Sequence, residues 1–294
     1  MSFDDFLKSA WADHADQPDA VATRLEQSLA LVNVSAQVPA YARLVTHVFG
    51  EHLGQWQRGI AVHDALRRVP AGDDRAGTAA ITRGIATLKY SSGDSQVLDG
   101  MALEDRIIVL ATAASVFVGQ QRFVPAVETY AQALALAQPG LPAGSAAPRA
   151  LAIGGNNLAS TLEGKRDRSA AETAGMVAAA EAALRYWKLA GTWLEEERAE
   201  YRLTRSRLQA GDVQGAVRSA SRCIGVCIEN SAPPFEFFFA HAVHAIALRA
   251  TGEHAASADA RRRALEQYAL VAPEEQASCK SDLEILDGTD GATR

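Results

Sequence analysis

Hydrophobic residues recur with the period of an α-helix along nearly all of the 294 residues of this chain. Short breaks rich in glycine, proline and aspartate separate the periodic segments, and the alternating, β-branched runs that mark strands are missing at useful length. Only 6% of the residues are aromatic, and alanine, the best helix former, dominates the apolar fraction. The pattern therefore predicts an all-α protein built from thin helical layers.

The breaks also predict where the helices lie. The first is expected over residues 3–15, and a second begins at Pro18 and carries Leu25, Leu29 and Val32 on one face. The others are expected over residues 39–53, 55–69, 74–90, 101–119, 122–138, 149–163, 169–190, 192–210, 212–230, 234–251, 253–271 and 274–286. The helix over 74–90 has no obvious partner in this pattern.

The most loop-like segment, Pro139 to Pro148, is the best candidate for a boundary. We therefore expect N-terminal helical repeats over residues 1–138, a loop over 139–148, C-terminal repeats with a final capping helix over 149–286, and a flexible tail over 287–294. The two sets of repeats are expected to form one continuous solenoid.

Small and bulky residues recur in the same order in several of the expected helix pairs. The aligned small residues are Ala126 and Ala133 in one pair and Ala216, Ala220 and Cys223 in another, with Gly211 and Asp212 at the turn. This order resembles the tetratricopeptide repeat family, in which small residues lie where paired helices touch. Gly211 and Gly252 are 41 residues apart, so the resemblance is to degenerate, lengthened repeats over residues 38–270.

The resemblance implies a right-handed α-solenoid of antiparallel helix hairpins with a concave groove that binds a protein or peptide. A closed, irregular helical bundle is the alternative fold, because small residues at helix crossings are general. The helix count favours the solenoid.

Charge and composition exclude several classes of function. The net charge of −6 gives no basic footprint for nucleic acid, and no run of 18 apolar residues exists to span a bilayer. Asp4 and Asp5 stand where a secretory signal needs positive charge. Three cysteines, an odd number, argue against a disulfide framework. We therefore expect a cytoplasmic protein that binds neither nucleic acid nor a membrane.

The titratable residues do not suggest an enzyme. His241, His244 and His254 could together hold a metal ion, but no acidic residue shares their face, and packing or solvent exposure explains them more simply. Cys223 and Cys227 are four residues apart, which is wrong for zinc knuckles and redox motifs. We therefore expect no catalytic residue, no cofactor and no metal, and we keep metal-dependent hydrolysis at the three histidines only as a remote alternative.

A cluster of four phenylalanines follows Pro233 and Pro234, and it has two interpretations. The cluster consists of Phe235, Phe237, Phe238 and Phe239. Burial between neighbouring helix pairs is the simpler interpretation. An exposed patch used for dimerisation or ligand capture is the other, and a homodimer is left open.

A stripe of arginines marks the candidate partner-binding site. Arg198, Arg202 and Arg205 fall within about 60° of one another on one expected helix, beside Tyr201. Of the acidic residues nearby, only Glu195 shares the stripe, so the helix itself leaves the arginine charges under-compensated. A solvated arginine face with transient links to neighbouring helices is the simpler alternative.

The tetratricopeptide resemblance implies that these four residues line the groove, with Asn156 and Asn157 in comparable places one unit earlier. Arginine binds carboxylates bidentately and tyrosine adds a stacking surface. The expected function is therefore a scaffold or adapter that binds a peptide or protein, with an acidic segment or a terminal carboxylate as the ligand. The alternative is a regulatory sensor that holds a small ligand or signalling peptide in the same groove.

Overall fold

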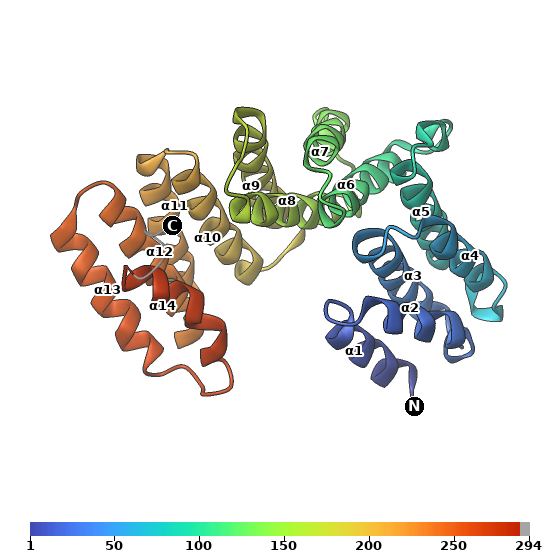
Figure 1. Ribbon diagram of the computed structural model, residues 1–294, viewed down its shortest axis with the longest axis horizontal. Coiled ribbons are helices and arrows are strands. Elements are labelled where there is room, and N and C mark those ends of the chain that lie inside the picture. Colours follow the sequence, from blue (N-terminus) through green and yellow to red (C-terminus); the bar gives the residue numbers. More distant parts are fainter. Residues whose placement is uncertain (289–294) are drawn as a thin grey trace. The chain divides into compact units, whose positions relative to one another are not determined.

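Helices are the only regular elements within residues 1–288, the part of the chain that the computed structural model describes (Figure 1). The expected all-α class is therefore confirmed. No helix in this range is long and apolar enough to cross a membrane. The tail expected over residues 287–294 lies outside the described residues except for Asp287 and Gly288, which follow the last helix.

The chain divides into two compact units, residues 1–154 and the residues from Gly155 onward. The division falls inside one helix, α8 (Ala147–Gly164), shortly after the segment expected to be a loop. Within that segment the backbone is non-helical up to residue 146, and α8 begins at Ala147.

The first unit consists of α-helices joined by short 3₁₀ turns and one π-helical turn. Its elements are α1 (Phe3–Asp13), α2 (Pro18–Gln27), η1 (Leu29–Leu31), η2 (Ser35–Gln37), α3 (Val38–Thr46), η3 (His47–His52), α4 (Trp56–Arg67), η4 (Pro70–Asp73), α5 (Arg75–Ser91), η5 (Ser95–Leu98), α6 (Leu103–Gly119), α7 (Phe123–Ala137) and the start of α8. The second helix ends at Gln27, so Leu29 and Val32 lie beyond it rather than on its face. Helix α5, which the pattern left without a partner, packs against α3, α4 and α6.

The π-helical turn η3 interrupts the single helix expected over residues 39–53. In it the backbone N–H of Leu53 donates to the carbonyl of Val48, five residues back, at 3.1 Å. The end of α6 lies directly against this turn. The amide of Gln120 donates to the carbonyls of Gly50 at 3.2 Å and Glu51 at 2.8 Å, and a Cβ on Gly119 would meet the Glu51 carbonyl oxygen at 2.4 Å. Packing against α6 therefore holds the widened turn.

The second unit continues from α8 with helices that pack on their neighbours in the chain. They are α9 (Ala170–Ala190), α10 (Trp193–Gln209), α11 (Val213–Glu229), α12 (Pro234–Ala250), α13 (His254–Tyr268), the 3₁₀ turn η6 (Gln276–Cys279) and α14 (Lys280–Leu286). Helix α12 also contacts α10 and α14. The last expected helix, over 274–286, is thus a 3₁₀ turn followed by a short α-helix.

The turn between α10 and α11 explains the Gly211 and Asp212 pair. Gly211 adopts a left-handed backbone with φ of 80°, which glycine tolerates best. The Asp212 carboxylate then accepts the N–H of Gly215 at 2.9 Å and caps α11. This pair therefore ends one helix and begins the next.

The aligned alanines are fully buried, which supports their assignment to helix contacts. Ala126 in α7 and Ala216 in α11 have no exposed surface. We expect Ala126→Leu or Ala216→Leu to lower the free energy of unfolding by about 1–3 kcal/mol, because the added atoms overfill a close-packed site. Urea denaturation measures this loss. Ala131→Leu, on the exposed side of α7, serves as the control, and equal stability of all three variants would contradict the assignment.

Candidate functional site

The second unit contains a pocket of about 510 Å³ on the face of α10 that carries the arginine stripe. Its lining comes from α8, α9, α10 and α12 and consists of Asn156, Trp187, Glu195, Glu197, Arg198, Ala199, Tyr201, Arg202, Phe235, Glu236 and Phe239. Asn156, Arg198, Tyr201 and Arg202, four of the six residues predicted from the sequence, therefore lie around one hollow. Asn157 and Arg205 do not line it.

Aromatic rings form the apolar part of the pocket. Tyr201 meets Phe239 edge to face with 5.8 Å between ring centroids, and Phe235 meets Phe239 at 5.1 Å in the same manner. Phe238 is fully buried, whereas Phe235, Phe237 and Phe239 are partly buried. The phenylalanine cluster is therefore neither wholly buried nor an open patch, because two of its rings line a pocket.

The arginines are paired with acids on other helices, which corrects the expectation that they are under-compensated. Arg198 donates to Glu236 of α12 at 2.6 Å, and Arg202 donates to Glu163 of α8 at 2.5 Å. Each acid has a nearly buried side chain. The sequence of α10 alone does not reveal these partners because they lie 38 and 39 residues away in the chain.

Arg205 lies in a polar network next to the pocket. Its guanidinium donates to the Tyr201 hydroxyl at 3.0 Å and lies 3.7 Å from Asp282 of α14 and 4.0 Å from Glu163. Tyr201 in turn donates to Asp282 at 2.6 Å. Burial raises the pKa of both Asp282 and Glu163, and the neighbouring arginines oppose that rise. The network fixes Tyr201, whose ring lines the pocket.

Glu197 is a fully buried carboxyl group at the inner side of the pocket. The thiol of Cys223 donates to its Oε1 at 3.0 Å. Burial raises the pKa of Glu197 to about 8, and the hydrogen bond from Cys223 opposes the rise while the charge of Glu236 adds to it. Glu197 therefore favours the protonated form near neutral pH, in which it carries no charge to neutralise Arg198.

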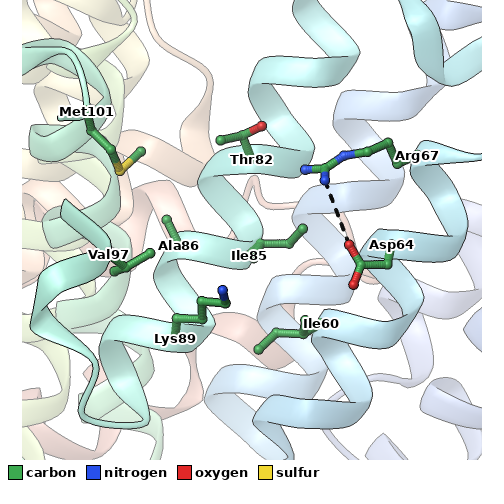
Figure 2. Close-up of a pocket in the computed structure, with 9 residues that line it drawn as sticks. All are labelled: Ile60, Asp64, Arg67, Thr82, Ile85, Ala86, Lys89, Val97 and Met101. Atoms are coloured by element: carbon green, nitrogen blue, oxygen red, sulfur yellow. Dashed lines mark ion pairs between the residues drawn. The ribbon is translucent and has the colours of Figure 1, made fainter. Parts of the chain in front are cut away.

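A second pocket, of about 250 Å³, lies in the first unit (Figure 2). Figure 2 shows Arg67 and Asp64 of α4 facing one another, with 3.9 Å between their charged atoms. The remaining lining residues are Ile60, Thr82, Ile85, Ala86, Lys89, Val97 and Met101. This pocket is smaller than the usual range for ligand sites, about 300–1,000 Å³, and no aromatic ring lines it. The pocket of the second unit is therefore the stronger candidate.

The histidines that come together are not those the sequence suggested. Within residues 1–288, the single group of three side chains able to share a metal ion is His14, His47 and His52, not the trio on α12 and α13. His241 is nearly buried and His254 is exposed. The three cysteines are free and buried, as expected of small packing residues.

The spacing of His47 and His52 hid this group from sequence analysis. Residues five apart on an α-helix point about 140° away from one another. Only the π-helical turn brings the two rings to the same side, and packing against a distant helix holds that turn. A search for histidines with π-helical spacing is the signal that could have found the pair.

Comparison with protein-family models and with curated proteins gives no match to this chain. The resemblance to tetratricopeptide repeats therefore stays a prediction that rests on the sequence pattern.

Proposed function

We propose that the chain is a non-enzymatic interaction protein that binds a peptide or protein segment in the pocket of its second unit. One observation carries this proposal: aromatic rings and two arginines with partly exposed side chains surround a hollow of about 510 Å³. This volume is that of a typical ligand site, and concave sites with apolar walls and a few polar groups are the usual places for binding.

The lining indicates what kind of segment would fit. An apolar or aromatic side chain of the ligand would pack between Trp187, Phe235 and Phe239, which are large and lose little freedom on binding. Arg198 has a side chain that is 56% exposed, so its guanidinium is accessible to an acidic group beside that anchor. A carboxylate there would share Arg198 with Glu236. Both an internal acidic residue and a terminal carboxylate satisfy this chemistry.

The proposal includes the architecture implied by the sequence resemblance, a right-handed, tetratricopeptide-like solenoid in the cytoplasm. Consecutive packing of α9 to α13 supports the helical-repeat part of it. A homodimer is left open. A regulatory sensor for a small ligand is the second candidate, and the pocket volume of about 510 Å³, which suits a small molecule equally well, favours it.

Selection from a displayed random peptide library tests the proposal. We expect the enriched peptides to carry an aromatic residue next to an acidic one, and to bind in a salt-sensitive way. Fluorescence anisotropy with a labelled selected peptide then gives Kd values. We expect Phe239→Ala and Arg198→Ala each to weaken binding by about tenfold, the loss typical of a central interface residue.

Arg262→Ala is the matched control, because Arg262 is an equally exposed arginine on α13 whose ion-pair partners within residues 1–288 are Asp259 and Glu266 of its own helix. Its affinity for the peptide should equal that of the unchanged protein. Selected peptides that bind Phe239→Ala and Arg198→Ala as tightly as the control would refute the pocket as the binding site. If the library yields no binder but a compound from a small-molecule screen raises the melting temperature of the protein, the result would favour the sensor.

A further inference from the structure

We propose that His14, His47 and His52 form a binding site for a divalent first-row transition-metal ion in the first unit. The site is independent of the pocket in the second unit. One nitrogen from each ring can be chosen so that all three lie within 4.8 Å of one another. Imidazole nitrogens are ligands that zinc, copper, nickel and iron accept readily.

The fold supplies these rings from two places in the chain. His14 is the C-cap residue that directly follows α1, and His47 and His52 are the first and last residues of the π-helical turn η3. The Nε2 atoms of His47 and His52 are 3.2 Å apart. Two nitrogens bound tetrahedrally to zinc at about 2.0–2.1 Å are about 3.3 Å apart. The π-helical turn therefore already holds two ligands at the separation that one ion requires.

The partners of the other ring nitrogens determine which atoms remain for the ion. His14 Nδ1 lies 2.6 Å from the carbonyl oxygen of Trp11, and His47 Nδ1 lies 3.1 Å from a carboxylate oxygen of Glu51. Both oxygens accept hydrogen bonds, so each Nδ1 carries the proton and each Nε2 keeps a lone pair. A carboxylate behind a ligating histidine is the usual outer partner of a metal site.

The third ring completes the set by a change of tautomer. Without an ion, His52 Nε2 donates its proton to the lone pair of His47 Nε2 across their 3.2 Å contact. When the proton of His52 lies on Nδ1 instead, the Nε2 atoms of all three rings keep lone pairs that one ion can bind.

The surroundings of the three rings are partly accessible to solvent. The side chains of His47 and Glu51 are about one-fifth exposed, and His14 and His52 are partly exposed as well. The Trp11 ring packs beside His14 and His47, with 5.1 Å between centroids in each case. Three histidines with one accessible position are the arrangement that lets a bound ion keep a water molecule or accept a ligand from outside.

Calorimetric titration of the chelator-treated, full-length chain with Zn²⁺ tests the site. We expect one Zn²⁺ per chain and a rise in melting temperature with added ion. Glu51→Gln should weaken binding by about 10–100-fold, as loss of an outer partner does. His47→Gln and His52→Gln should each weaken it by about 100-fold or more, since they remove a ligand itself. Titration with Co²⁺ should give the visible absorption of a tetrahedral, nitrogen-bound ion.

A double variant, His244→Gln with His254→Gln, is the control, because it removes two histidines of the second unit and should keep full affinity. Circular dichroism checks the fold of every variant, and His14→Gln, at a helix end, tests the site if changes in η3 impair folding. Absence of stoichiometric Zn²⁺ binding at micromolar concentrations would overturn the proposal. So would equal affinity of the ligand variants and the control, which would leave the three rings as an aromatic packing cluster only.

Discussion

Replacing Arg205 with alanine should lower the free energy of unfolding by about 3 kcal/mol at neutral pH, because it strips a cation from nearly buried acids. Arg205 is the group that connects Asp282, Glu163 and the Tyr201 hydroxyl. Without it, Asp282 keeps the hydrogen bond from Tyr201 and the charge interaction with Arg202. Chemical denaturation followed by circular dichroism measures the loss.

The pH dependence of this loss separates charge from packing. Burial already raises the pKa of Asp282, so in the alanine variant this carboxyl group should take up a proton on acidification and the destabilisation should shrink. Arg205→Met, which keeps much of the apolar stem, should show the same pH dependence. Arg262→Ala, which removes an exposed arginine, should change stability by at most about 0.5 kcal/mol. An effect of Arg205→Ala no larger than this would contradict the assignment of a buried network.

The same network determines which arginines of the stripe can be replaced by glutamate without unfolding the protein. From the sequence alone, Arg202→Glu combined with Arg205→Glu is expected to abolish binding and leave the fold intact. The structure predicts instead that this pair of changes unfolds the second unit, because it sets new carboxylates against Glu163 and Asp282. Arg198 has the most exposed side chain of the three arginines, so it is the one to replace in the binding test, with circular dichroism to check that the variant is folded.

Replacing Glu197 with glutamine should stabilise the protein in alkaline solution and have little effect near pH 5. An unfolded glutamate ionises near its ordinary pKa of 4.5, whereas Glu197 in the folded protein ionises at about 8. Between these values the folded state binds the additional proton, so stability falls as pH rises through this window. Because glutamine does not ionise, the stability of the Glu197→Gln variant does not fall in this way as pH rises. The gain above pH 8 should be on the order of 2–4 kcal/mol.

Urea denaturation at several pH values between 5 and 9 follows this change, and the difference between the two proteins should grow with pH up to about 8 and then level off. Glu236 and Cys223 interact directly with Glu197, so the substitution also changes the interactions of these neighbours and the difference measures the whole group. Glu266→Gln, at an exposed glutamate of α13, is the control and should leave the pH profile unchanged. Parallel profiles for Glu197→Gln and the unchanged protein would show that the buried carboxyl group does not bind this proton.

The helices were predictable from the sequence because their signals are local. These signals are the hydrophobic period, the first-turn proline at residue 18 and the turn at Gly211 and Asp212, and each acts within a few residues. The observed helices lie close to the ranges that the signals predict. The segment over residues 39–53 departs from the prediction because its π-helical turn depends on Gln120 and Gly119, which are remote in sequence.

The candidate site was predictable in part for the same reason. The spacing of Arg198, Tyr201 and Arg202 places them on one face of any helix, and the structure finds them around one pocket. The acids that neutralise the arginines, the phenylalanines that form the wall and the histidines of η3 all come together through tertiary packing. No pattern within one helix could have revealed those contacts.

The polar network of α10 has a consequence for the order of events in folding. Its contacts join residues that are 38, 39 and 81 residues apart, from Arg198 to Glu236, Arg202 to Glu163 and Tyr201 to Asp282. Closing such loops costs chain entropy, so these contacts form after the neighbouring helices have paired. Interactions that are absent from the transition state govern the rate of unfolding far more than the rate of folding. The polar network of α10 therefore lowers the rate of unfolding, because α8, α12 and α14 cannot separate from α10 until these contacts break.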